Sequence, residues 1–181
     1  MFNFILQSAQ DNNVFFDERL PVSEDLIFTF RYLHFAKQLR LVYKIAYQYR
    51  QSVVGISRNF SESALSKIRY VGDAYKDVLD CFDEFETRVY YEGYVDRCMR
   101  QAVWALKSGP YHSACPWNRN QRIAWIRELV MIPWVNEAVN KYAGIERTDK
   151  LCLIISLLLR YRLFSLMDVL LHSYNAVRKR R

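Results

Sequence analysis

Apolar residues recur at helical spacing through the middle of the chain, from Ser61 to about Leu106. The residues that set this spacing are Leu65, Ile68, Tyr75, Leu79, Phe82, Phe85 and Val89. Such a period is that of the buried stripe of an amphipathic helix. The five glycines and four prolines are few for 181 residues, which argues against a fold built on many tight turns. We therefore predict one long helix or two in series over 61–106, with a break near Gly93.

Further helices are expected on both sides of this stretch. Before it, the pattern predicts a short helix over 2–11 and a helix from Ser23 to about Ala36, with Ser23 as its N-cap. The second of these helices has apolar residues nearly all round, which predicts burial between two layers. Pro133 and Thr148 are expected to begin later helices, as first-turn residue and as N-cap. The later helices are predicted over 118–131, 134–142, 149–159 and 162–178.

Two segments before residue 60 favour β structure instead. Residues 39–43 and 46–50 alternate apolar and polar side chains and contain β-favouring residues. The predicted fold class is therefore mainly α. A small α/β remnant with two short strands occupies about 1–60, and a multi-helix, bundle-like extension occupies 61–181.

The formal net charge of +7 is unevenly distributed. Residues 141–181 hold nine Lys and Arg against three acids, whereas 73–96 hold eight acids against two bases. The acids of the middle stretch are expected on a solvated helix face. A basic end behind an acidic middle indicates a local electrostatic surface, and no nucleic-acid motif accompanies it. We expect no nucleic-acid partner.

The cysteines and histidines do not form a metal-binding pattern. The four cysteines never form a CxxC pair, and the three histidines show no HExxH spacing. We therefore predict no metal site. Because no secretory leader precedes the cysteines, they are expected to be reduced thiols, buried as small apolar residues, in a cytoplasmic protein.

The segment FDERLPVSEDL, residues 16–26, carries two acidic pairs. Asp17 and Glu18 lie in a predicted loop, and Glu24 and Asp25 lie in the first turn of a predicted helix. A helix N-terminus favours negative charge, so a carboxylate there stays ionised and can accept a proton near neutral pH. The alternative is that both are ordinary first-turn acids.

Four elements of the sequence resemble, in order and spacing, the closing part of family 2 glycosyltransferases. They are FDE at 16–18, ED at 24–25, YQYR at 47–50 and Ser57. These inverting enzymes of the GT-A fold build bacterial capsule, exopolysaccharide and O-antigen. The resemblance is specific over residues 1–60 and only general beyond. It implies transfer of a sugar from a nucleotide-sugar donor to a saccharide or lipid-linked acceptor in surface polysaccharide synthesis.

The resemblance also implies roles for individual residues. Asp25 is the general base that takes the proton from the acceptor hydroxyl, and Glu24 supports it. Asp17, Arg50 and Ser57 are implied to bind substrate, since an arginine fork suits a diphosphate leaving group. The alternative for Arg50 is a side chain at a strand end that points into water.

The nucleotide-binding half of that family has no counterpart in this sequence. Only 15 residues precede Phe16, and the DxD motif that holds Mg²⁺ or Mn²⁺ is missing. We therefore expect the second part of a larger enzyme, with no cofactor of its own and no turnover alone. A cloned fragment, a broken gene and one partner of a split enzyme all fit. Exposed surface in such a part predicts self-association. The alternative function is a non-catalytic helical interaction module or remnant.

The last two helices combine apolar side chains with arginines. The nearly apolar run at 151–159 is too short to cross a bilayer, which needs about 20 residues. The helix at 162–178 is expected to place Asp168 and His172 opposite an apolar face. That face consists of Leu163, Leu166, Met167, Leu170, Leu171, Tyr174 and Val177. Residues 151–181 are therefore candidates for binding an anionic membrane surface, peripherally at its inner face. The alternative is a hairpin packed on its own domain with a charged, solubilising tail.

Overall fold

The computed structural model describes residues 9–20, 22–36, 38, 43, 59–82, 84–144 and 149–178. The protein is mainly helical, and these residues contain no strand. The predicted mainly-α fold class is confirmed. Of the two predicted strands, only Tyr43 falls within the described residues. Of the predicted first helix, residues 9–11 are described and are helical, and the turn at Asn12 and Asn13 ends them as expected.

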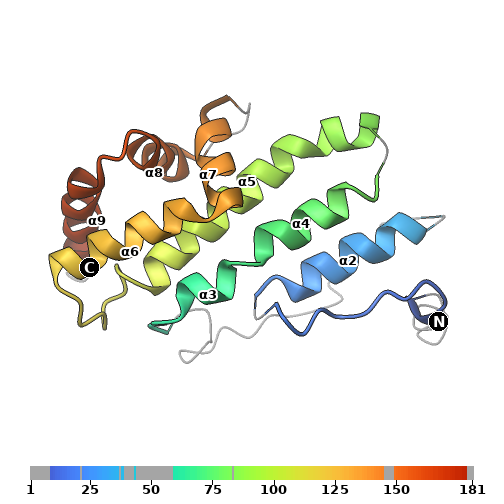
Figure 1. Cartoon of the computed structure of the whole chain (residues 1–181), viewed down its shortest axis with the longest axis horizontal. Coiled ribbons are helices and arrows are strands. Elements are labelled where there is room, and N and C mark those ends of the chain that lie inside the picture. Colours follow the sequence, from blue (N-terminus) through green and yellow to red (C-terminus); the bar gives the residue numbers. More distant parts are fainter. Residues whose placement is uncertain are drawn as a thin grey trace.

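Helix α5, Glu84–Ser108, is the long central helix of the molecule (Figure 1). Helices α3, Ala64–Ile68, and α4, Val71–Leu79, pack along it, and α2, Glu24–Phe35, packs on α4. Helix α7, Pro133–Lys141, also packs on α5 and is followed by a short 3-10 turn, η2, at Tyr142–Gly144. The bundle is therefore elongated along α5.

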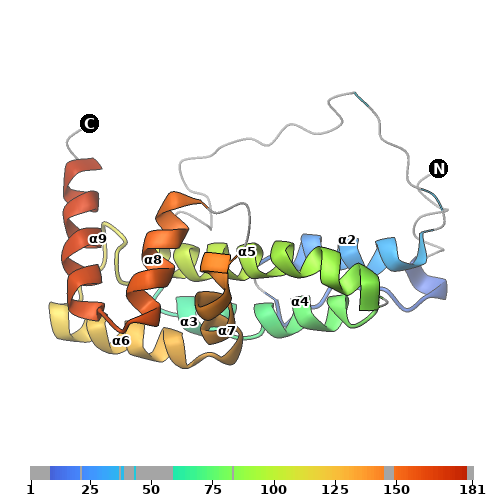
Figure 2. The same cartoon turned by 90° about the horizontal axis from the view of Figure 1, so that it is seen from above.

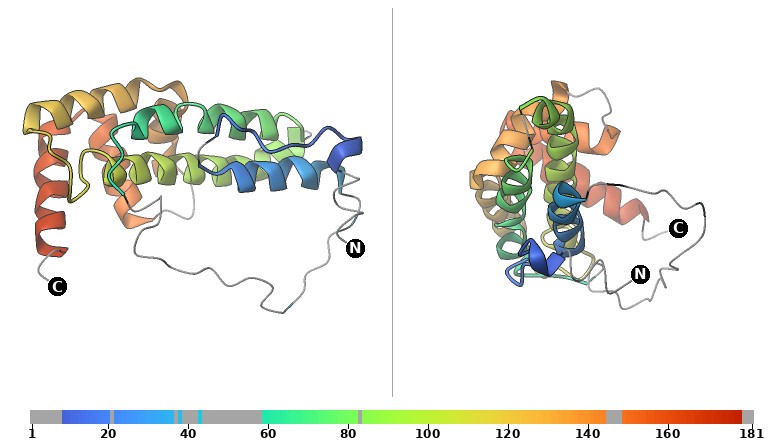
Figure 3. Two further views of the ribbon diagram at one scale, coloured as in Figure 1. Left: turned by 90° about the horizontal axis from the view of Figure 1, so that it is seen from below. Right: turned by 90° about the vertical axis from the view of Figure 1, so that its right-hand side faces the viewer.

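The remaining helices build one end of the bundle. Helix α6, Arg119–Met131, contacts α7 and α9, and α8, Lys150–Arg160, forms a hairpin with α9, Phe164–Arg178. Seen from above, this hairpin stands across the end of the bundle that is far from the amino terminus (Figure 2). The view from below shows α9 at that end, beside the start of α6 (Figure 3). Much of α9 consequently has a neighbour on one side only.

One continuous core holds these helices together. Helix α5 supplies a fully buried stripe at helical spacing, which includes Val95, Met99 and Leu106. Leu20 and Ile27, from the amino-terminal segment, belong to the same core. The described residues before 60 thus pack directly on the helical extension, and the division into two parts at residue 60 stays a prediction.

The helical stretch over 61–106 is interrupted at different places from the one predicted. The chain forms α3, α4 and α5, with the main break after Leu79, where residues 80–82 form a turn, and Gly93 lies inside α5. At that break, the amides of Cys81 and Phe82 donate to the carbonyls of Val78 and Leu79 at 3.1 and 3.0 Å, which closes a tight turn. Gly93 is tolerated because a single exposed glycine costs a helix only about 1 kcal/mol.

Helix α2 is a surface helix, so the prediction that it is buried between layers is wrong. Ile27 is its one fully buried residue, and Phe35 is 43% exposed. The described residues that contact α2 lie mainly on α4, so only one face of α2 is covered. Apolar residues all round a helix predict burial only where enough neighbours exist to cover it.

The predicted helix starts are close to the observed ones. Pro133 is the first residue of α7, as expected. Helix α6 begins with a capping box in which the side chains of Asn118 and Gln121 each accept from the other's backbone amide, at 3.0 and 2.9 Å. Asp149 caps α8 by accepting from the amides of residues 151 and 152. The predicted cap, Thr148, lies outside the described residues.

Gly72→Ala is expected to destabilise the protein, and Gly93→Ala to stabilise it. A Cβ at Gly72 would strike the buried Trp134, reaching 2.6 Å from its Cβ, whereas a Cβ at Gly93 would meet nothing within 4 Å. Overpacking costs about 1–3 kcal/mol, and alanine in an open helix position gains about 0.5–1 kcal/mol. Urea unfolding of both variants measures the two shifts. Shifts of the same sign in the two variants would contradict this description of α4, α5 and α7.

Candidate functional site

The amino terminus of α2 is held by α5 and lacks a side-chain cap of its own. Ser23 occupies the N-cap position in a left-handed conformation, with φ of 65°, and its side chain makes no capping hydrogen bond. Its Oγ instead accepts from the Nε2 of Gln101, on α5, at 2.7 Å. The predicted helix start is therefore right, and the predicted capping role of the side chain is wrong.

Glu24 and Asp25 form the first turn of α2, as predicted. Asp25 is exposed and Glu24 is half-buried. Oδ1 of Asp25 accepts from the amide of Leu26 at 2.7 Å, and the backbone carbonyl of Asp25 accepts from Oγ1 of Thr29 at 2.7 Å. The carboxylate of Asp25 is thus oriented by its own helix turn while it stays accessible to a solute.

Asp17, the other predicted acid, is enclosed by two arginines. Its carboxylate accepts from Nε and Nη2 of Arg19 at 2.9 and 2.7 Å, and Nη2 of Arg31 lies 3.9 Å from Oδ2. The hydrogen bonds from Arg19 lower the pKa of Asp17 to about 2. Its side chain is 8% exposed. Asp17 therefore fixes the loop on α2, and its proposed contact with substrate stays a prediction.

Aromatic stacking fastens the same loop to the same helix. The ring of Phe16 lies 4.3 Å from that of Phe28, with an angle of 3° between their planes. Phe28 in turn stacks near Tyr32, at 6.5 Å. The FDE loop and the ED helix start thus form one structural unit. The other two predicted substrate residues, Arg50 and Ser57, lie outside the described residues.

Sequence reasoning missed two residues that build this unit. Arg31 contacts Asp17 from the middle of α2, and Gln101 reaches Ser23 from α5. Arg31 is 14 residues from its partner and Gln101 is 78 residues from its own, so no local spacing marks either pair. Within the described ranges, no three His, Cys, Asp or Glu side chains gather in a way that could hold a metal ion.

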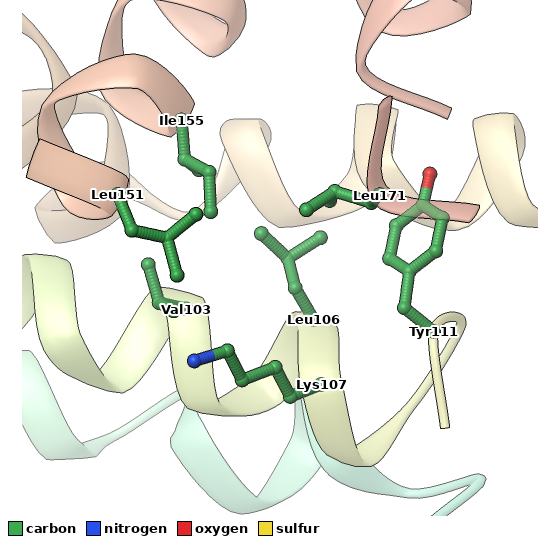
Figure 4. A pocket seen from close by; sticks show the side chains of 7 residues that line it. All are labelled: Val103, Leu106, Lys107, Tyr111, Leu151, Ile155 and Leu171. Carbon is green, nitrogen blue, oxygen red and sulfur yellow. The ribbon is translucent and has the colours of Figure 1, made fainter. Parts of the chain in front are cut away.

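The enclosed cavity between α5, α8 and α9 is a packing gap. It measures about 10 Å³, which is room for one water at most. Figure 4 shows Val103 and Leu106 facing Leu151, Ile155 and Leu171 across it, with Lys107 and Tyr111 at its edge. A mostly apolar space of this size does not bind a ligand.

A larger open groove follows the turn between α8 and α9. It consists of two hollows of about 320 and 240 Å³ that share Val130 and Arg162 in their linings. Arg127 lines the first hollow and Arg160 the second. Glu128 also lines the first. Among the described residues, no carboxylate lies within ion-pair distance of these three arginines. The groove is therefore rich in positive charge.

The apolar face of α9 differs from the predicted one. Met167 and Leu171 are buried, but Leu166 and Leu170 are 49% and 46% exposed. Asp168, predicted on the polar face, is buried. The side chain of Asp168 faces the interior because Arg122, on α6, donates two hydrogen bonds to it, from Nε at 2.7 Å and from Nη2 at 3.1 Å. Of the five residues of the predicted apolar face whose burial is described, Leu163, Leu166 and Leu170 consequently point into solvent.

The four cysteines differ in burial. Cys98 and Cys152 are buried, as predicted, while Cys115 is half-buried and Cys81 is exposed. Burial raises the pKa of Cys98 to about 12 and that of Cys152 to about 11, so these two thiols stay protonated near neutral pH.

Comparison of the chain with protein-family models, with curated proteins and with solved structures gives no match. Of the helices in the described ranges, none has the length and hydropathy that crossing a membrane requires.

Proposed function

We propose that this chain supplies the acceptor-side part of a family 2 glycosyltransferase, with Asp25 as the general base. One observation carries the proposal. The two acidic motifs that resemble the family's FDE and ED motifs pack together as one unit, through Phe16 on Phe28 and Asp17 beside Arg31. Glu18 and Asp25 are the exposed acids of these motifs, and Asp25 is the one that is oriented by a hydrogen bond within the first turn of α2.

The proposed chemistry uses the carboxylate of Asp25 and an acceptor hydroxyl. Asp25 takes the hydroxyl proton as the acceptor oxygen attacks the anomeric carbon of a nucleotide sugar. The bond to the diphosphate breaks, the nucleoside diphosphate leaves with the electron pair, and the anomeric configuration inverts. Glu24 supports the charge of the site, and the bond from Gln101 to Ser23 keeps the helix start in place. General-base help of this kind is worth about 10²–10⁴ in rate.

A second candidate function is a helical interaction module that acts without catalysis. The exposed apolar side chains of α8 and α9 favour it, because monomeric proteins rarely leave such side chains grouped on one surface. This candidate requires no donor-binding half. In both candidates a cytoplasmic position with peripheral membrane contact is part of the proposal.

The test begins with the DNA directly upstream of the codon for Met1. We expect a segment that encodes a nucleotide-binding strand pattern and a DxD motif, in frame or shifted. The two parts, joined in one polypeptide, should release nucleoside diphosphate from a nucleotide sugar when bacterial lipid-linked acceptors are supplied. A promoter and ribosome site directly before Met1, with no such segment nearby, would favour the interaction module.

A further inference from the structure

We propose that the α8–α9 hairpin docks on an anionic lipid surface. In the docked state, the exposed apolar side chains enter the membrane–water interface of the bilayer, and the arginines of the adjoining groove bind lipid phosphates. The inference does not depend on sugar transfer, because the residues that carry it lie on α6, α8, α9 and the turn between α8 and α9, whereas Asp25 lies on α2. Figure 2 shows α9 at the end of the bundle beside the start of α6, while α8 packs on α5 and α7.

The apolar part of the surface runs along both helices. On α8 and at its C-cap it comprises Ile154, Leu157 and Tyr161, at spacings of three and four residues, with exposed fractions of 51%, 37% and 65%. The helix spacing places these side chains on one stripe. A second group, Leu163, Leu166, Val169 and Leu170, follows in the turn and along α9, and each of them is about half exposed. Seven large apolar side chains thus face water along one hairpin.

The charge beside this stripe is positive. Arg160 and Arg162 flank Tyr161 at the turn, and both line the groove that Arg127 enters from α6. Glu128 is the acid that lines the same groove. The sequence that follows α9 reads Lys179, Arg180, Arg181, so the basic character continues along the chain. Phosphate groups complement these cations, and arginine binds phosphate with two parallel donors.

The backbone at Arg162 supports a role for its side chain beyond forming the turn. Arg162 adopts φ of 55°, and the hydrogen bonds from its amide to Leu159 and from that of Leu163 to Leu158, at 3.1 and 2.9 Å, end α8. Glycine is preferred at such a left-handed position. An arginine there makes the turn less stable than a glycine would, which is consistent with a site where strain is kept for function.

A lipid surface suits this hairpin better than a second copy of the chain. The apolar side chains would pack against those of a second copy, but the arginines of two copies would then approach each other, and like charges repel. An anionic bilayer can bind both features at once. Half-exposed leucines can enter the boundary between headgroups and acyl chains, and arginines can bind the lipid phosphates.

The experiment measures binding of the full chain to vesicles of phosphatidylcholine alone and of phosphatidylcholine with phosphatidylglycerol. We expect sedimentation with the anionic vesicles only, and weaker binding at high salt because salt screens the attraction. The variant Leu166→Ser/Leu170→Ser should bind at least tenfold more weakly. A matched control, Phe15→Ser/Tyr70→Ser, removes two exposed aromatic residues from elsewhere and should bind as the wild type does.

The charge contribution has its own variant and control. Arg127→Gln/Arg160→Gln/Arg162→Gly should weaken binding by about 100-fold, because each basic residue near an anionic surface is worth about 1 kcal/mol, or about fivefold. The control Arg69→Gln/Lys76→Gln/Arg97→Gln removes the same formal charge from exposed positions on the rest of the bundle. It should bind nearly as tightly as the wild type.

The single variant Arg162→Gly separates binding from folding. Glycine relieves the left-handed strain, so the melting temperature should rise while vesicle binding falls about fivefold. A loss of binding in this variant cannot then come from unfolding. Three outcomes would overturn the proposal. The wild type could fail to bind anionic vesicles, or the leucine variant and the triple arginine variant could both bind as tightly as the wild type. The third is a dimer in solution that dissociates in Leu166→Ser/Leu170→Ser and shows no vesicle binding.

Discussion

Replacing Asp168 with alanine is expected to lower the free energy of unfolding by about 3–5 kcal/mol. Asp168 is 3% exposed and lies on α9. Its carboxylate accepts two hydrogen bonds from Arg122, at 2.7 and 3.1 Å, and one from the hydroxyl of Tyr111, at 3.0 Å. Removing the carboxylate leaves the mostly buried guanidinium of Arg122 without its counter-charge, and an uncompensated charge in that position is costly.

The neighbours of Asp168 provide graded controls. Arg119 lies 3.8 Å from Asp168 and is 57% exposed, so Arg119→Gln should cost less than about 1 kcal/mol. Tyr111→Phe removes one buried hydrogen bond and should cost about 1 kcal/mol. Urea unfolding followed by circular dichroism measures all three variants. If Asp168→Ala costs no more than Arg119→Gln, the buried pair does not hold α9 on α6.

The same pair predicts an acid-sensitive stability. Burial by itself would raise the pKa of Asp168, but the hydrogen bonds from Arg122 and Tyr111 outweigh it and hold the pKa below the usual value. A carboxylate whose pKa is lower in the folded chain stabilises that chain above its unfolded pKa, and this contribution is lost as the pH falls through the folded pKa. Stability should therefore fall below about pH 4.

The Asp168→Asn variant identifies the source of this acid sensitivity. Because asparagine does not titrate, the decline in stability below about pH 4 should be shallower in Asp168→Asn than in the wild type. Asp17, with its pKa lowered to about 2, and Asp149, whose pKa is lowered by the backbone hydrogen bond from Cys152, contribute to the part that remains. Identical slopes in the two proteins, measured by urea unfolding between pH 2 and 7, would assign the sensitivity to other carboxylates.

The helices of this protein were largely predictable because their signals are local. Apolar spacing and first-turn residues placed α2, α6, α7, α8 and α9 within a few residues of their observed bounds. The orientation of α9 was not predictable in the same way. Its rotation depends on Arg122, which is 46 residues away in the chain, and an acid beside apolar residues normally predicts a solvent-facing side.

The same contrast between local signals and contacts distant in the chain applies to the candidate site at α2. The position of Asp25 in a first turn follows from its neighbours in sequence, and it was predicted. The conformation of Ser23 depends on Gln101, 78 residues later, so its left-handed backbone could not be foreseen. Which apolar side chains of the α8–α9 hairpin are exposed could not be predicted either. The sequence shows which residues are apolar, but not which other helices cover them.

Under the proposed function, Asp25→Asn is expected to reduce sugar transfer by about 10²–10⁴ in a polypeptide that joins this chain to the proposed nucleotide-binding half. The amide cannot take a proton from the acceptor hydroxyl. It keeps an oxygen that can accept from the amide of Leu26, as Oδ1 of Asp25 does at 2.7 Å, so α2 should start as before. Donor affinity should be unchanged, because the base contacts the acceptor and not the nucleotide.

The control for this variant is Asp77→Asn, which makes the same chemical change at an exposed position on α4. It should leave both the transfer rate and the unfolding free energy near the wild-type values. Titration calorimetry with the nucleotide sugar checks that Asp25→Asn still binds donor. If Asp25→Asn and Asp77→Asn retain equal turnover, the exposed carboxylate at the start of α2 is an ordinary first-turn acid, and the proton must be taken by another group.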